Sequence, residues 1–169
     1  MIYTGQTGWM QGYPFGFIFD STTNDFVCGE MEKAIVNCAK IANPDLILLE
    51  GQSSLLNPSG PCGSEFILAG NAKAVILHHV PGRKHYMDTP KPMDTVEKHI
   101  QIIETMGAKV LGITLNSEGM NALEILQYQK QLNERLGIPV IKPLEEGIDA
   151  LIPVLQNYCR NYRSPEIHV

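Results

Sequence analysis

The sequence predicts an α/β fold, a three-layer sandwich built on a mostly parallel sheet. Short apolar runs alternate along the chain with longer segments of helical periodicity, an order typical of strands joined by crossover helices. The runs carry hydrophobic residues at consecutive positions, as strands covered by helices on both faces do. A length of 169 residues suits one domain, so we expect residues 1–169 to form a single α/β domain.

Five short apolar segments predict the strands of this sheet. Glycine, proline or asparagine stands beside most of them, as expected where a strand gives way to a turn. Because their apolar residues are consecutive, we expect four or five of these segments to pair in parallel. The segments are 2–4, 45–50, 73–79, 109–116 and 138–143.

Four longer segments with apolar residues near a 3.6-residue spacing predict helices. They are 25–42, 94–106, 120–136 and 147–162. Asn24 is the expected N-cap of the first helix, since asparagine side chains accept hydrogen bonds from the free amides there. Pro153 should bend or restart the last helix, and a further short helix is expected to open within Gly60–Glu65.

Composition excludes several classes of protein. The formal charge of −5 at pH 7 argues against a non-specific nucleic-acid binder, which needs a basic surface. A hydrophobic content of 44% excludes a disordered chain. The apolar runs are far shorter than the roughly 20 residues of a membrane helix, so we expect no membrane span.

The four cysteines predict an intracellular protein. Cys28, Cys38, Cys62 and Cys159 match neither a zinc-binding pair nor a dense disulfide framework, so four reduced thiols are expected. The first residues show neither a basic nor an apolar signal pattern, and we expect a cytoplasmic location.

Polar residues gather where parallel strands would end, which is where ligands bind in α/β sheets. Glu50 ends one apolar run, at a position where a carboxylate is costly unless it has a partner. It could act as an acid or base or meet a metal–phosphate group, although emergence into solvent or helix capping would also explain it. The other polar or glycine residues at these strand ends are Gly5, Gln6, Thr7, Gly51, Gln52, Ser53 and Asn116.

Histidines and basic residues follow the 73–79 run. His78 and His79 should point to opposite faces of a strand, so at most one faces a ligand directly. Arg83 offers a rigid fork for a carboxylate or phosphate, and His85 follows it in the same turn; a solvated loop is the alternative. We expect no metal centre made by the protein, because neither an HExxH motif nor paired cysteines occur.

Four ordered sequence blocks resemble a known bacterial and archaeal family. They are TGQTGWMQG (4–12), DFVCGEMEK (25–33), LLEGQSSLLNPS (48–59) and LHHVPGRKHY (77–86). The family was long catalogued as a domain of unknown function, and some of its members are D-glutamate N-acetyltransferases. Its larger domain is similar to the P-loop α/β group that includes dethiobiotin synthetase. By this resemblance Glu50 and Gly51 match a loop that approaches metal and phosphates, and Asn116 matches an asparagine that contacts the base.

The resemblance also implies a missing part. Family members carry, before the TGQTG block, a Rossmann-like domain and a Gly-Lys-Thr phosphate loop, and this sequence holds no GxxxxGK. We therefore expect the C-terminal portion of a longer architecture. Loss of the first strand would leave an exposed apolar edge, which predicts a homo-oligomer or a partner chain.

Three functions follow from these features. The first is transfer of an acetyl group from acetyl-CoA to a D-amino acid such as D-glutamate, with Glu50 or His79 as the base. Arg83 would bind the substrate carboxylate, and Gln6, Thr7, Gln52, Ser53 and His85 would line the substrate site. The second is an ATP-dependent ligase or phosphotransferase, with Mg²⁺ near Glu50. The third is a non-catalytic module that needs a partner.

Overall fold

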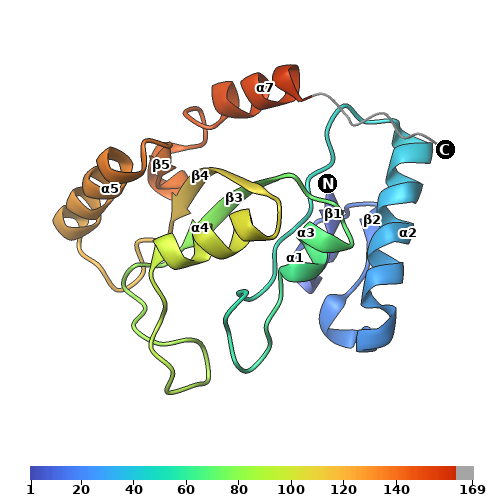
Figure 1. Cartoon of the computed structure of the whole chain (residues 1–169), viewed down its shortest axis with the longest axis horizontal. Helices are drawn as coiled ribbons and strands as arrows, with labels where there is room; N and C mark the ends of the chain where they lie inside the picture. The colour runs from blue at the N-terminus through green and yellow to red at the C-terminus, as the bar shows by residue number, and fades with distance from the viewer. Residues whose placement is uncertain (163–169) are drawn as a thin grey trace. The chain divides into compact units, whose positions relative to one another are not determined.

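Helices alternate with parallel strands along the chain, which confirms the predicted α/β class. The computed structural model describes residues 1–162 (Figure 1). They divide into two compact units, one formed by residues 1–74 and 85–109 (unit 1) and the other by residues 75–84 and 110 onward (unit 2). The expectation of one domain over 1–169 stays a prediction.

Unit 1 is built on a small parallel sheet. Strand β1 (Ile2–Tyr3) pairs with β2 (Phe15–Gly16), with Ile2 opposite Phe15. On its other side β1 forms a single bridge to Leu49, in which the Ile2 amide donates to the Leu48 carbonyl at 2.8 Å. The N-terminal strand expected at 2–4 is therefore present.

The prediction of a buried strand at 45–50 is wrong. This segment is extended but makes only the one bridge to Ile2, and Leu46 and Leu48 are exposed. Its neighbour β1 is only two residues long, so the ladder of hydrogen bonds between the two segments cannot extend further.

The core of unit 1 lies between this sheet and a long helix. Helix α2 (Asn24–Ala42) begins after Thr23, so Asn24 is the first helical residue and not the N-cap. The helix ends at Asn43, whose left-handed backbone (φ 43°) terminates it. Its apolar stripe packs with residues from β1 and the following loops, and the buried set is Ile2, Phe17, Val27, Met31, Ala34, Cys38, Cys62 and Phe66.

Four shorter elements complete unit 1. Helix α1 (Gln6–Met10) and the 3₁₀ turn η1 (Phe19–Ser21) flank β2 along the chain. Helix α3 (Ser64–Leu68) confirms the helix expected to open within 60–65. Helix α4 (Val96–Thr105) starts two residues later than predicted, because the Thr95 side chain accepts from the Lys98 amide and caps it.

Unit 2 carries a three-stranded sheet in the order β3–β4–β5. Its strands are β3 (Ala74–His79), β4 (Lys109–Leu115) and β5 (Val140–Ile141), and β5 runs parallel to β4. Hydrogen bonds join the starts and the ends of β3 and β4, from Lys109 to Lys73 and from Asn116 to His79, so these strands are parallel as well. Three of the predicted strands are thus confirmed, with β5 shorter than expected.

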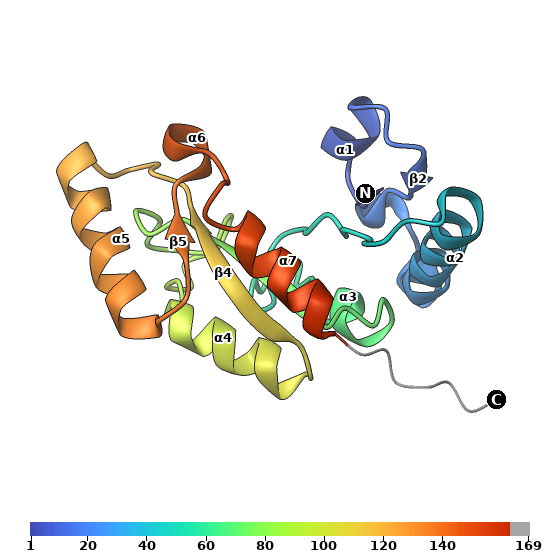
Figure 2. The same ribbon diagram turned by 90° about the horizontal axis from the view of Figure 1, so that it is seen from above.

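Three helices belong to the part of unit 2 that lies within residues 1–162. Helix α5 (Ala122–Leu136) packs against β5 and starts with a capping box between Asn121 and Glu124. The segment predicted as one helix over 147–162 begins only at Ile152, where Pro153 occupies its first turn (α7, Ile152–Asn161). A four-residue helix, α6 (Pro143–Glu146), precedes it. Figure 2 shows α5 and α7 on different sides of β4 and β5.

Within residues 1–162, no helix has the length and the apolar character that a membrane crossing requires.

Candidate functional site

Glu50 lies at the centre of a set of hydrogen bonds that hold the loop between β1 and α1. Its Oε2 atom accepts from the amides of Thr4 and Gly5, at 2.8 and 3.1 Å. The Thr4 hydroxyl donates back to the Glu50 carbonyl at 2.9 Å. Gln52 adds a further bond, from its Nε2 to the Thr4 carbonyl at 2.7 Å. We call this arrangement of Thr4, Gly5, Gly8, Glu50 and Gln52 the Glu50 clamp.

Two glycines allow the clamp to close. A Cβ atom on Gly5 would lie 2.4 Å from Gln52 Nε2, and one on Gly8 would lie 2.7 Å from Glu50 Oε2. Real Cβ atoms essentially never make contacts this short. A side chain at Gly5 would therefore displace the flexible end of Gln52, whereas Gly8 also faces Tyr3 Cβ at 2.6 Å, which is fixed to the backbone, so Gly8 requires glycine for close approach. The glycine-rich opening of the sequence therefore serves this contact in the structure.

The remaining predicted residues of this region lie around the clamp. Gln6 and Thr7 are exposed in the first turn of α1, and Gly51 is exposed between the two clamp side chains. Ser53 has a left-handed backbone (φ 30°), and its hydroxyl accepts from Asn57 at 3.0 Å. The Oε1 atom of Glu50 accepts no hydrogen bond from any of residues 1–162, so one carboxylate oxygen remains for a ligand.

The predicted residues of unit 2 gather at the ends of β3 and β4. His79 Nε2 lies 3.0 Å from the Tyr128 hydroxyl, and the His79 carbonyl accepts from the Asn116 amide at 2.9 Å. Asn116 Oδ1 accepts from the Glu118 amide at 2.8 Å. Arg83 reaches Glu118 with an ion pair of 3.1 Å, so its guanidinium already has one carboxylate partner.

The pKa of His78 is influenced by Arg83, which lies in the same loop. Its Nδ1 lies 2.9 Å from the Thr114 hydroxyl. Partial burial lowers the pKa of this imidazole, and the positive charge of Arg83 lowers it further. His78 is therefore held toward its neutral form, in which one ring nitrogen can accept a hydrogen bond.

A cavity of about 220 Å³ opens beside the carboxyl ends of β4 and β5. Ser117, which follows Asn116, donates to Glu145 of α6 at 2.5 Å in its wall. This is the edge of a parallel sheet at which α/β proteins bind ligands. The lining residues are Ser117, Met120, Ala122, Ile125, Lys142 and Glu145.

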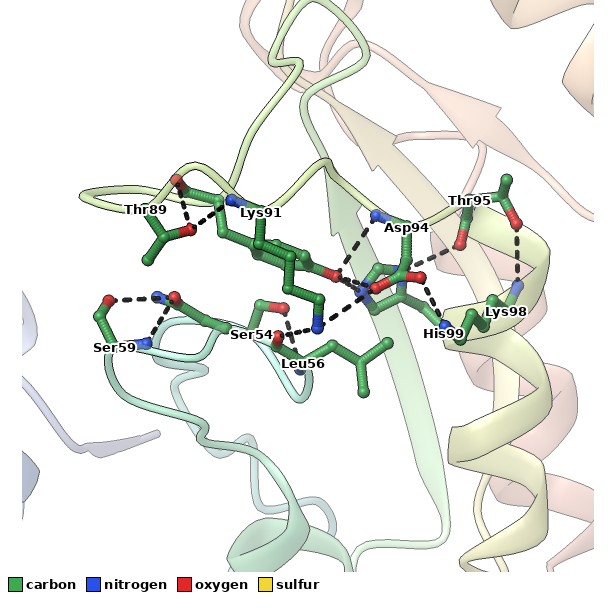
Figure 3. Close-up of polar contacts among 11 residues, drawn as sticks. Ser54, Leu56, Ser59, Thr89, Lys91, Asp94, Thr95, Lys98 and His99 are labelled. Atoms are coloured by element: carbon green, nitrogen blue, oxygen red, sulfur yellow. Dashed lines mark hydrogen bonds and ion pairs between the residues drawn. The ribbon is translucent and has the colours of Figure 1, made fainter.

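A buried polar cluster in unit 1 was not predicted from the sequence (Figure 3). The Tyr86 hydroxyl donates to Asp94 Oδ2 at 2.9 Å and lies 3.2 Å from His99 Nε2. Tyr86 and His99 are only 3% and 7% exposed. Because His99 Nδ1 faces the Thr95 carbonyl at 2.9 Å, that nitrogen carries the proton. Burial raises the pKa of Tyr86, and its bond to Asp94 raises it further.

Two lysines contact the cluster of Tyr86, Asp94 and His99. Lys98 bonds Asp94 at 2.6 Å and is the main cause of a lowered pKa of that carboxyl. Lys91 lies 5.1 Å from the centre of the Tyr86 ring and donates to the Leu56 carbonyl at 3.0 Å. The cluster thereby fixes the loop that follows Gln52. The predicted residue His85 precedes it and is exposed.

The thiol of Cys62 is buried and is not activated for nucleophilic chemistry. Burial, together with the charges of Glu65 and Asp20, raises the pKa of Cys62 to about 12. Its position before α3 therefore does not activate it. No group of three or more His, Cys, Asp or Glu side chains that could hold a metal ion occurs within residues 1–162.

The sequence matches one family model over most of its length. Residues 1–152 match DUF1611, a domain of unknown function, in its C-terminal P-loop domain. The chain belongs to the DUF1611 family. A solved DUF1611 structure from Anabaena variabilis resembles this chain with a TM-score of 0.81 and 26% identity, over 92% of this chain and 47% of that one.

Two curated relatives carry a functional name. The D-glutamate N-acetyltransferase of Tritonibacter scottomollicae is 27% identical over 90% of this chain, and that of a Pseudoalteromonas species is 26% identical over 81%. The aligned regions cover 47% and 43% of those two proteins. The chain thus spans about half the length of these relatives.

Proposed function

We propose that this DUF1611 chain is, or forms the C-terminal portion of, an N-acetyltransferase that acetylates a D-amino acid such as D-glutamate with acetyl-CoA. Two relatives that align with most of this chain are named D-glutamate N-acetyltransferase. The observation that carries the proposal is the Glu50 clamp, which holds a carboxylate at the end of an extended segment with one oxygen free of protein hydrogen bonds among residues 1–162.

The chemistry needs a proton acceptor beside the substrate amine. The neutral amine nitrogen attacks the thioester carbonyl carbon, a C–N bond forms, and the C–S bond breaks to release the CoA thiolate. The nitrogen loses a proton in this step, and Oε1 of Glu50 would take it. His79 is the alternative base, although its ring is bonded to the Tyr128 hydroxyl. Amides of Gln6 and Gln52 would act as polar donors to the reactants.

Arg83 would bind the carboxylate of the amino acid. Its present partner, Glu118, lies on an exposed loop, so a substrate carboxylate could replace it at the same guanidinium. We expect Arg83→Ala to raise KM for D-glutamate at least tenfold, with a smaller change in kcat. Arg160→Ala, at the exposed end of α7, should leave KM unchanged. An unchanged KM in Arg83→Ala would remove this role.

The cofactor side of the proposal involves Gly5, Gly51 and Asn116, which we propose approach acetyl-CoA. The description of the family as a P-loop domain favours a second candidate, an ATP-dependent ligase or phosphotransferase with Mg²⁺ at Glu50. In either case we propose a cytoplasmic protein that acts on small molecules. It would act as a homo-oligomer or together with polypeptide equivalent to the part of the relatives that this chain does not match.

Thermal unfolding with each nucleotide tests the proposal. A ligand that binds only the folded chain stabilises it by about 2.7 kcal/mol at one hundred times its Kd. We expect acetyl-CoA to raise the melting temperature and Mg·ATP to leave it unchanged. A shift with Mg·ATP alone would replace the transferase by the ligase.

A further inference from the structure

Lys91 fastens two loops of unit 1 to each other. One loop, residues 53–63, begins directly after Gln52 of the Glu50 clamp, and the other spans residues 85–95. The Lys91 Nζ atom donates to the Leu56 carbonyl at 3.0 Å, as Figure 3 shows. This contact places an ammonium group on the loop that follows the clamp.

The neighbours of this ammonium group do not balance its charge. Asp94 is its ion-pair partner, with Lys91 Nζ 3.8 Å from Oδ2. That oxygen already accepts from the Tyr86 hydroxyl at 2.9 Å, and Lys98 binds the other carboxylate oxygen at 2.6 Å. Within residues 1–162, neither lysine has another carboxylate partner. One carboxylate therefore serves two ammonium groups, and one positive charge of this cluster is in excess.

The ammonium group is also held in place. Its Nζ lies 5.1 Å from the centre of the Tyr86 ring, and Tyr86 is only 3% exposed. The Leu56 carbonyl uses one of its three N–H donors, and Asp94 at 3.8 Å is beyond hydrogen-bond distance. The Lys91 side chain is 43% exposed, so a ligand can reach the other donors. A positioned ammonium group of this kind loses little side-chain entropy when it binds an anion.

We propose that Lys91 binds the side-chain carboxylate of an acidic amino-acid substrate, and that the Tyr86 cluster serves to position it. The inference rests on the proposed function and names the feature of the substrate that would be selected. D-Glutamate carries two carboxylates, and Arg83 is assigned only one of them. The second would form a charge-assisted hydrogen bond with Lys91, whereas the side-chain amide of D-glutamine offers only a neutral oxygen. Lys91 would thereby favour D-glutamate over D-glutamine.

Binding of the free amino acids tests this inference without acetyl transfer. D-Glutamate and D-glutamine are titrated separately into this chain, alone and co-expressed with the part of the Tritonibacter protein that it does not match, and followed by NMR. We expect Lys91→Met to weaken binding of D-glutamate at least tenfold and to leave binding of D-glutamine unchanged. Ser59→Ala is the matched control, because it removes another hydrogen bond between the same loops, to the Met87 carbonyl, without changing charge. It should bind both amino acids like the wild type.

A side-chain signal gives a second measurement that does not depend on the folding of a variant. In the wild-type chain, the ¹³Cε resonance of Lys91 should shift with D-glutamate and stay in place with D-glutamine. The proposal is overturned if D-glutamine shifts this resonance equally, or if the wild type does not bind D-glutamate in either preparation. An equal loss of affinity for both amino acids in Lys91→Met, or an unchanged affinity for D-glutamate, would also overturn it.

These outcomes separate this inference from the proposed function. Selective binding of D-glutamate through Lys91 without any acetyl transfer would refute the transferase and leave the carboxylate site in place. Acetyl transfer to D-glutamate that Lys91→Met does not alter would refute the role of Lys91 and leave the transferase in place.

Discussion

Replacement of Gly8 by alanine tests the close approach on which the Glu50 clamp depends. The added Cβ would lie 2.6 Å from Tyr3 Cβ and 2.7 Å from Glu50 Oε2. Carbon atoms in contact lie about 3.5–4.0 Å apart, so the overlap is about 1 Å. Overpacking of this kind costs roughly 1–3 kcal/mol. Alanine gains about 1 kcal/mol over glycine as a helix former, which leaves a net loss of about 0–2 kcal/mol.

Chemical denaturation and thermal unfolding measure this loss. For a chain of this size, each kcal/mol corresponds to about 2–4 °C in Tm, so the Gly8→Ala variant should melt at a temperature up to about 8 °C lower. Gly29→Ala is the matched control, because Gly29 is also helical but a Cβ added there would meet no other side chain within 4 Å. It should gain roughly 0.5–1 kcal/mol. If Gly8→Ala were as stabilising as Gly29→Ala, the packing argument for the clamp would be refuted.

Three further predictions concern other parts of the structure. Tyr86→Phe should lower the free energy of unfolding by roughly 1–3 kcal/mol, because it leaves buried polar partners without the hydroxyl; a denaturation curve equal to wild type would contradict this. Because the folded pKa of His78 is lowered, the unfolded chain takes the proton first, and His78 disfavours the folded state as the pH falls below its ordinary pKa. Arg83→Met should raise the pKa of His78 toward its ordinary value in an NMR titration, and no rise would exclude the Arg83 charge as a cause. Iodoacetamide at pH 8 should label exposed Cys28 rapidly and Cys62 slowly by peptide mass spectrometry, and equal rates would contradict the raised pKa of Cys62.

The strands that the sequence predicts well are those with a long partner. The runs that became β3 and β4 pair with each other, and consecutive apolar residues are enough to identify them. The run at 45–50 has the same composition, but its neighbour β1 offers only two residues. Strand formation depends on the partner as much as on the segment, and a single sequence does not contain that information.

The candidate site was likewise predictable only in part. Glu50 and Gln52 could be predicted because they follow an apolar run, at the position where α/β proteins place their polar groups. Their hydrogen bonds to main-chain atoms of Thr4 and Gly5 could not be predicted, because every residue offers a backbone carbonyl and nearly every residue an amide, whatever its side chain. The Tyr86 cluster was missed for a related reason: it depends on how the loop of Asp94 folds back, which periodicity does not describe.

Transfer of a labelled acetyl group tests the central claim most directly. Acetyl-CoA with a ¹³C-labelled acetyl group is incubated with this chain and D-glutamate or L-glutamate, both alone and with the part of the Tritonibacter protein that this chain does not match, co-expressed with it. We expect labelled N-acetyl-D-glutamate by mass spectrometry, far more than the L-product, and a rate at least tenfold lower in Glu50→Gln. Absence of labelled product both alone and with the added polypeptide would contradict the proposed acetyltransferase.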